Sequence, residues 1–293
     1  MDGENGWVAA KGIEDFRDTV VPALSARPAE NNQLLAVFDR LLTEGPHAFG
    51  ERDPELLVRQ GYRHVAALLR TPPYAYILGG SPDDAGVSAL VDVLLDPGNR
   101  HDGREINVPE ACERSLTEAW AQRTGRTPRV LQRMRLYRLE RPLGPDPRPP
   151  GHAKLAEHAD VPAVARFLQE FWTSIDHARP LDTTMTARRI AAARVAEGTF
   201  WLWLDEAGEP VSLAGTTPVV AGTGRVGPVY TPPHLRGRGY AGAVTSAAGQ
   251  ALLERGAGEV LLFTDLTNPT SNALYQRIGY RPVGDRVLIG LEG

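Results

Sequence analysis

Five prolines fall within eleven residues near the middle of the chain, in Arg141–Gly151 (RPLGPDPRPPG). Proline fixes φ and removes a backbone hydrogen-bond donor, so this segment is not expected to form an interior helix or strand. Its composition is typical of a semi-rigid, extended linker. About 140 residues lie on each side, enough for each half to bury a core of its own. We therefore predict two domains, residues 1–140 and 152–293, joined by a linker over 141–151.

Composition narrows the class of protein. The 293 residues include 32 basic and 36 acidic side chains, a net charge of −4, which argues against a dedicated nucleic-acid-binding protein. Cys112 is the single cysteine, which excludes an intrachain disulfide and a multi-cysteine metal site, and no metal is predicted. Neither an apolar run of about 18 residues nor a signal-peptide pattern is visible. We expect a cytoplasmic protein without a membrane span.

Apolar periodicity in the second half predicts alternating helices and strands. Helices are expected over 162–175, 184–197, 240–255 and 268–278, several of them closed by glycine. Strands are expected over 199–204, 211–217, 226–230, 259–264 and 286–291. A hairpin followed by strand, helix, strand, helix and strand predicts an α/β fold with a mixed, mostly antiparallel sheet flanked by helices.

An internal repeat links the two halves. Thr117–Pro128 (TEAWAQRTGRTP) and Ser271–Pro282 (SNALYQRIGYRP) match at an offset of 154 residues, at Ala119, Gln122, Arg123, Gly125 and Pro128 of the first copy. If the aromatic strand Tyr74–Leu78 corresponds to Phe200–Leu204, the first copy is shorter by close to 30 residues. The missing piece would be the loop and helix at 235–256. The first copy has only Asp96–Gly103 in its place. The carboxylates of Asp96 and Asp102 in this segment would repel an anionic ligand such as phosphate. The repeat predicts a duplicated fold whose first copy has lost this loop.

The segment Val229–Gly242 (VYTPPHLRGRGYAG) carries the clearest chemistry. A strand ends at Tyr230, two prolines stop the pairing, and a glycine- and arginine-rich turn opens a helix. Glycines allow a tight turn in which successive N–H groups converge, and the helix N-terminus adds free N–H groups and a positive dipole end. These features together suit a pyrophosphate. The alternative interpretation is an ordinary glycine-rich turn with two solvated arginines, Arg236 and Arg238.

This segment resembles the GNAT superfamily of N-acetyltransferases, whose motif Gln/Arg-x-x-Gly-x-Gly/Ala is matched by Arg236, Gly239 and Ala241. The resemblance implies two GNAT-like domains in tandem, with acyl-CoA bound by the second. It implies that the strand end pairs with the pantetheine arm, beyond a bulge at Gly227-Pro228 that separates neighbouring strands. The residues that it assigns to CoA binding are Val229, Tyr230, Thr231, Arg236, Gly237, Arg238, Gly239, Tyr240, Ala241, Gly242 and Asn268.

The resemblance also implies a catalytic acid. Tyr275 occupies the position of the family tyrosine that protonates the departing CoA thiolate, although a tyrosine there is also compatible with a plain core role. Asn268 followed by Pro269 is equally an ordinary helix N-cap. The first copy has Ala121 where Tyr275 aligns. Loss of both acid and loop in one copy indicates that these features serve function in the other.

No general base is assigned. The strand 226–230 contains no carboxylate. Asp265 is the nearest candidate, and bracing of the loop before Asn268 is its favoured alternative. His234 is expected to be solvated, and Asp176 and His177 lie between two helices where the family builds its acceptor site.

The sequence therefore predicts an acyl-CoA-dependent N-acyltransferase, with acetyl-CoA as the expected donor and the amine of a small molecule as the acceptor that attacks the thioester directly. Two alternatives stay open: an aminoacyl transferase that uses aminoacyl-tRNA, the one case in which nucleic acid would be a partner, and a non-catalytic acyl-CoA sensor. The acceptor and the oligomeric state are not determined by the sequence.

Overall fold

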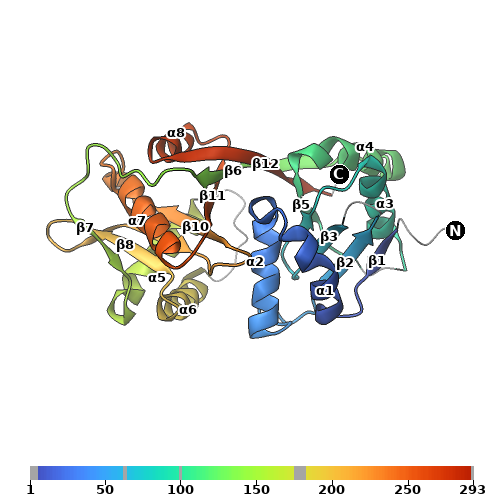
Figure 1. Cartoon of the computed structure of the whole chain (residues 1–293), viewed down its shortest axis with the longest axis horizontal. Helices are drawn as coiled ribbons and strands as arrows, with labels where there is room; N and C mark the ends of the chain where they lie inside the picture. Colours follow the sequence, from blue (N-terminus) through green and yellow to red (C-terminus); the bar gives the residue numbers. More distant parts are fainter. Residues whose placement is uncertain (1–5, 62–64, 99–100, 175–182, 292–293) are drawn as a thin grey trace. The chain divides into compact units, whose positions relative to one another are not determined.

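The computed structural model describes residues 6–61, 65–98, 101–174 and 183–291 (Figure 1). The chain divides into two compact units. The first comprises Met1–Leu136, Thr264–Asn268 and Pro282–Gly293, and the second comprises Tyr137–Phe263 and Pro269–Arg281. Each unit therefore contains residues from both halves of the sequence. The predicted domain 152–293 differs from the second unit at its C-terminal end.

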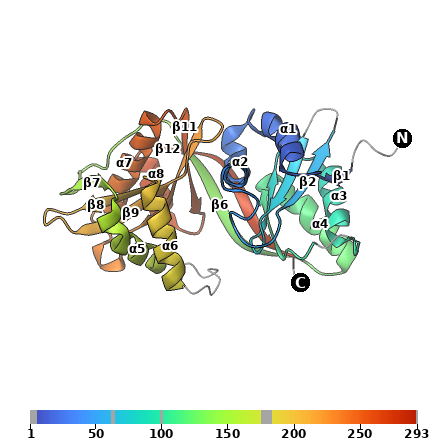
Figure 2. The ribbon, with the colours of Figure 1, turned by 90° about the horizontal axis from the view of Figure 1, so that it is seen from below.

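The first unit contains β1 (Trp7–Ala9), α1 (Ile13–Leu24), α2 (Pro28–Glu44), β2 (Glu55–Gln60), β3 (Val65–Arg70), β4 (Tyr76–Gly79), α3 (Asp84–Leu95), β5 (Glu105–Pro109), α4 (Glu113–Thr124) and most of β6 (Arg129–Leu139). Strands β1 to β4 pair antiparallel in order, and β4 pairs parallel with β5. Apolar residues of α3 and α4 form one core cluster with the strands. Figure 2 shows α1 and α2 on the other side of these strands.

The C-terminal strand β12 (Tyr280–Gly290) completes the first unit. Its residues pair antiparallel with β5, from Arg286 opposite Pro109 to Gly290 opposite Glu105. Arg286 is buried and donates hydrogen bonds to the Asn107 side chain (2.5 Å) and to the Leu78 carbonyl oxygen (2.8 Å). This pairing is the physical reason why residues 282–293 belong with the first unit.

The second unit contains β7 (His152–Leu155), α5 (Val161–Thr173), α6 (Thr183–Ala196), β8 (Phe200–Leu204), β9 (Pro210–Thr216), β10 (Thr223–Tyr230), α7 (Tyr240–Glu254), β11 (Glu259–Asp265) and α8 (Pro269–Arg277). Strands β7 to β10 pair antiparallel in order, and β10 pairs parallel with β11. Apolar residues of α5 and α6 form one core cluster, and those of α7 and α8 form another. The predicted mixed, mostly antiparallel α/β fold is confirmed.

The two units have the same order of elements, so the predicted duplication is present. One part of the predicted correspondence between the copies is wrong. By element order β4 takes the place of β10, so Tyr74–Leu78 does not correspond to Phe200–Leu204. The helix expected to be missing is present as α3. What is shorter is the connection that precedes it, with four residues (80–83) between β4 and α3 and nine (231–239) between β10 and α7.

The segment 141–151 contains neither helix nor strand, as predicted, but it is not a free spacer. The N–H of Leu143 donates to the Ile278 carbonyl oxygen (3.3 Å), so the segment lies against the second unit. In the described part of the chain, no helix is both long and apolar enough to cross a membrane.

Candidate active site

Strand β10 parts from its parallel neighbour before it ends. The pairing of β10 with β11 covers Thr223–Arg225 and 259–261, and β10 continues for five residues beyond it. On its other edge, the register with β9 shifts between Val226 and Val229. Gly215 of β9 makes room for this bulge, because a Cβ there would lie 2.8 Å from the Gly227 carbonyl oxygen. The bulge predicted at Gly227-Pro228 is therefore present, and it leaves one backbone edge of the strand end without a β11 partner.

Side chains of the loop itself and of β9 hold the loop that follows β10 in place. Arg236 Nε donates to the Thr231 carbonyl oxygen (3.0 Å). Ser212 Oγ of β9 donates to the Tyr230 carbonyl oxygen (3.0 Å) and lies 2.8 Å from the Thr231 hydroxyl oxygen. These bonds fix the path of the chain from the strand end into the loop.

Helix α7 begins with free backbone donors. Its N-cap is Gly239, at φ +83°, and no side chain makes a capping hydrogen bond there. Gly237 also has a positive φ (+76°), a conformation that only glycine adopts without strain. Arg236 and Arg238 are exposed in the same turn. Exposed N–H groups at a helix N-terminus, flanked by two guanidinium groups, form a suitable site for a phosphate-bearing ligand.

Tyr275 lies on α8, in the core cluster that also contains Tyr240 of α7 and Val226 of β10. Its ring packs against those of Tyr137 and Tyr280, with centroids 6.4 and 6.1 Å away. Burial raises the pKa of Tyr275 to about 12. The phenol is therefore neutral at pH 7 and carries the proton that a general acid needs.

The structure places the other predicted residues as follows. Val229 and Tyr230 are at the end of β10, and Tyr240, Ala241 and Gly242 form the first turn of α7. Asn268 directly precedes α8, and its N–H donates to the Asp265 carbonyl oxygen (3.1 Å).

The candidate bases have other roles or lie outside the described residues. Asp265 accepts hydrogen bonds from Gln132 Nε2 (3.0 Å) and from the Thr267 N–H (2.7 Å), so it braces its loop. His234 is exposed. Asp176 and His177 are outside the described part of the chain.

Sequence reasoning missed Glu170. This carboxylate lies on α5, between Phe167 and Phe171, whose rings both contact the Tyr230 ring with centroids 6.1 and 6.4 Å away. Burial first, and then a hydrogen bond to the Glu170 carboxylate, raise the pKa of Tyr230, while Arg236 acts in the opposite direction. The strands were the expected source of a carboxylate, whereas Glu170 comes from a helix. The spacing of Phe167 and Phe171 on the α5 face would have been the signal.

Comparison with known proteins relates the second half of the chain to a family. The acetyltransferase (GNAT) family profile matches residues 161–280, which contain the parted strand, the loop and Tyr275. Residues 161–280 thus match the GNAT acetyltransferase family. It is 28% identical over 305 residues to mycothiol acetyltransferase of Beutenbergia cavernae, a comparison that covers 89% of this chain and 95% of that protein.

Solved GNAT structures share the fold along nearly the whole chain. A GCN5-related N-acetyltransferase from Sphaerobacter thermophilus has a TM-score of 0.59 at 17% identity, covering 98% of this chain and 96% of that one. One from Kribbella flavida has a TM-score of 0.58 at 20% identity, covering 92% and 96%. A tandem GNAT protein from the clavulanic acid biosynthesis pathway has a TM-score of 0.57 at 13% identity, covering 99% of both chains. The tandem GNAT arrangement expected from the sequence is thereby shown.

The first unit has a different arrangement at the corresponding helix. The N-terminus of α3 is capped by Asp83, whose carboxylate accepts from the Gly86 N–H (2.8 Å). Arg59 pairs with the same carboxylate at 3.2 Å, and its guanidinium lies where a Cβ on Gly86 would be. The N-terminus of α3 is thus capped by an internal carboxylate that is paired with its own arginine.

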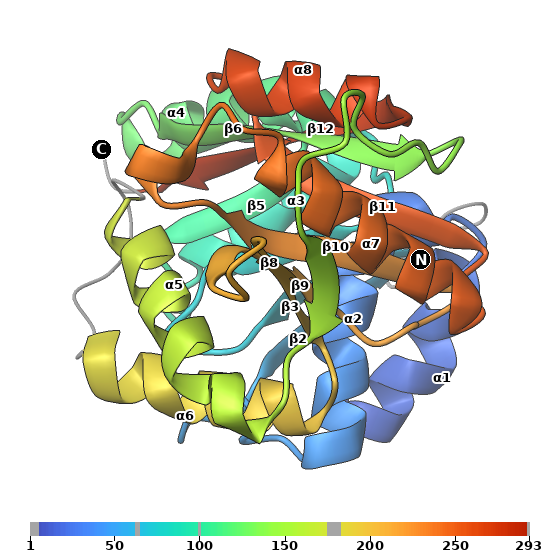
Figure 3. The same cartoon turned by 90° about the vertical axis from the view of Figure 1, so that its left-hand side faces the viewer.

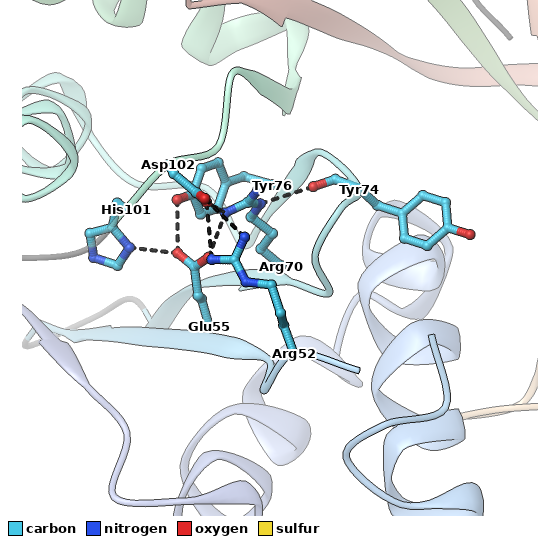
Figure 4. Close-up of polar contacts among 7 residues, drawn as sticks. All are labelled: Arg52, Glu55, Arg70, Tyr74, Tyr76, His101 and Asp102. Carbon is cyan, nitrogen blue, oxygen red and sulfur yellow. Dashed lines mark hydrogen bonds and ion pairs between the residues drawn. The ribbon is translucent and has the colours of Figure 1, made fainter. Parts of the chain in front are cut away.

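A charged cluster also lies in the first unit (Figure 4). Glu55 accepts hydrogen bonds from Arg70 (2.5 Å) and Tyr76 (2.8 Å), and its carboxylate lies 2.6 Å from His101 Nδ1. Asp102 is bound by Arg70 and by Arg52, and these hydrogen bonds hold the pKa of its carboxyl well below the usual range. The cluster joins the beginning of β2, the end of β3 and the beginning of β4. The role that we predicted for Asp102, repelling phosphate, is wrong because two arginines neutralise it and it precedes β5 rather than α3.

Proposed function

We propose that the second unit transfers the acyl group of acyl-CoA, with acetyl-CoA as the donor, to the amine of a small molecule. The observation that carries this proposal is the uncapped, glycine-rich N-terminus of α7, at the end of a strand that has parted from its neighbour. The relative named mycothiol acetyltransferase favours a small-molecule acceptor.

The proposed CoA contacts follow the chain. Val229, Tyr230 and Thr231 offer backbone groups to the pantetheine arm, and Asn268 holds the arm from the start of α8. The backbone N–H groups of residues 237–242 bind the pyrophosphate, with charge added by the side chains of Arg236 and Arg238. An Asp at position 239 would place a carboxylate among these donors.

In the proposed reaction the amine nitrogen attacks the thioester carbonyl carbon, and the carbon–sulfur bond then breaks. Backbone N–H groups at the end of β10 stabilise the negative charge on the carbonyl oxygen. The departing thiolate takes the proton of the Tyr275 hydroxyl, the amine loses its proton to solvent, and solvent returns a proton to the Tyr275 phenolate. Burial keeps the Tyr275 proton in place at neutral pH, as its raised pKa of about 12 indicates.

For the first unit we propose a GNAT-like scaffold that binds no CoA. Three features support this: a connection of four residues before α3, the Asp83 cap, and Arg59 beside it. A carboxylate at a helix N-terminus satisfies the donors that a phosphate would otherwise bind.

The test is Gly239→Asp, which introduces a negative charge at the N-cap of α7. We expect the affinity for CoA to fall at least about tenfold, or about 1.4 kcal/mol, measured by calorimetry. Gly208→Asp is the matched control, because Gly208 has the same positive φ (+82°) in an open turn of the same unit. Release of free thiol from acetyl-CoA with a panel of amines tests turnover. Unchanged CoA binding by Gly239→Asp would contradict the site, and binding without turnover would favour a sensor.

A further inference from the structure

The segment 141–151 runs along α7 in the second unit. Figures 1 and 3 show this green segment between β6 and β7 passing beside α7. Ser246 of α7 donates its hydroxyl to the Leu143 carbonyl oxygen (2.9 Å), and the indole N–H of Trp203 donates to the Pro150 carbonyl oxygen (2.9 Å). The segment is therefore tied to the unit at both of its ends.

Small residues on α7 allow this close approach. A Cβ on Gly242 would lie 3.5 Å from Pro145, and one on Gly239 would lie 3.5 Å from Pro149, which is buried. With Ser246, these glycines form a stripe at helical spacing on the face that meets the segment. Pro149 consequently packs against the N-cap residue of α7, where the pyrophosphate is proposed to bind.

Arg148, the residue before Pro149, is a cationic side chain that is held in position. The Arg148 guanidinium lies over the Trp203 ring, 5.8 Å from its centroid. Pro149 packs at Gly239 and Pro150 is bound by the same indole, so Arg148 directly precedes two anchored residues. Consecutive Cα atoms are about 3.8 Å apart, so the side chain of Arg148 starts within one residue of the α7 N-cap. Arg148 is exposed, so its charge is available to a ligand.

We propose that Arg148 binds the 3′-phosphate of the CoA ribose, and that the segment 141–151 forms the outer wall of the nucleotide end of the site. CoA carries its charge in two places, the pyrophosphate and the separate 3′-phosphate. Free N–H groups at the α7 N-terminus suit the first, and a forked guanidinium suits the second. This inference rests on the proposed function.

The test compares CoA with 3′-dephospho-CoA by calorimetry at low salt. Wild type is expected to bind CoA at least about tenfold more tightly than 3′-dephospho-CoA. Arg148→Gln is expected to lose that preference by weakening the binding of CoA alone. Arg189→Ala, which removes an exposed arginine of α6, is the control and is expected to keep the preference.

Each outcome has a defined consequence. Retained binding of 3′-dephospho-CoA by Arg148→Gln shows that the variant is folded. Equal weakening of both ligands would mean that Arg148 acts only by holding the segment, and it would overturn the inference. Equal binding of both ligands by wild type would also overturn the inference about Arg148, but it would leave the proposed function intact. If wild type binds neither ligand, the proposed function itself fails.

Discussion

Tyr275 and Tyr280 lie side by side in one core, and their hydroxyl groups have different surroundings. The Tyr280 hydroxyl is buried and has no hydrogen-bond partner among the described residues. Such a group destabilises the fold by about 1–3 kcal/mol. The Tyr275 hydroxyl is the proposed acid. Replacing each tyrosine by phenylalanine removes one oxygen from the same aromatic cluster, so the two variants are matched.

We expect Tyr275→Phe to lower kcat by about 10²–10⁴-fold, the usual contribution of general acid catalysis. CoA affinity should change little because the ring remains. Single-turnover kinetics with acetyl-CoA measure the chemical step. Tyr280→Phe should keep kcat and raise the free energy of unfolding. Wild-type kcat in Tyr275→Phe, or an equal loss in both variants, would assign Tyr275 to the core alone.

The raised pKa of Tyr275 also predicts how its contribution to stability varies with pH. The unfolded chain loses this proton near pH 10, whereas the folded chain holds it until about pH 12. The stability that the neutral phenol contributes is therefore fully present below about pH 10 and is lost as the pH rises toward 12. Urea unfolding at about pH 9 and 11 should show wild type losing stability relative to Tyr275→Phe. A difference that does not change with pH would contradict the burial of the phenol.

At the scale of elements, β12 depends on one buried arginine. Arg286 donates to the Asn107 side chain, to the Asn107 carbonyl oxygen and to the Leu78 carbonyl oxygen. Burial lowers its pKa to about 10, so it is still charged at neutral pH. It therefore joins β12 to β5 and β4 through hydrogen bonds to neutral groups.

We expect Arg286→Met to lower the free energy of unfolding by at least about 2 kcal/mol, because buried acceptors lose their donors. Urea unfolding measures the change. Arg129→Met is the control, an exposed arginine of β6, where a change within about 0.5 kcal/mol is expected. Equal effects of the two substitutions would show that β12 does not depend on these bonds.

The elements of the second half were predictable because apolar periodicity and glycine stops mark them. Helix α7 begins at Tyr240 as predicted, and β11 begins at Glu259 as predicted. Strand β7 was missed because its four residues are at most half-buried and carry no alternating pattern. The first part of β12 was missed because its residues 281–284 are exposed. Partner choice was also unpredictable, since an apolar strand such as 286–291 does not specify which sheet it joins.

The candidate site likewise has parts that the sequence predicts and parts that it does not. The loop and Tyr275 lie in continuous motifs that sequence alone displays. Glu170 comes to Tyr230 through the packing of α5, and the sequence signal for this is limited to the spacing of Phe167 and Phe171. The packing of Pro149 against Gly239 was equally unpredictable. A proline-rich composition predicts an extended segment, but it does not indicate which surface that segment packs against.

For the whole molecule we predict one CoA per chain. The α3 N-terminus is capped by Asp83, and the α7 N-terminus has no side-chain cap. Calorimetric titration of the full chain should therefore give a stoichiometry of one CoA, and Gly239→Asp should abolish this binding. Two equivalents, or one that survives this substitution, would place CoA in the first unit.

The pairing of β12 with β5 of the first unit has a consequence for biosynthesis. The hydrogen bond between Arg286 and Asn107 joins residues 179 positions apart, and β5 gains this neighbour only after residues 286–290 have been translated. Until those residues have left the ribosome, a nascent first unit presents an unpaired edge at β5, which favours association with other chains. The order of synthesis is thus not the order of folding. The half that is made first is completed last.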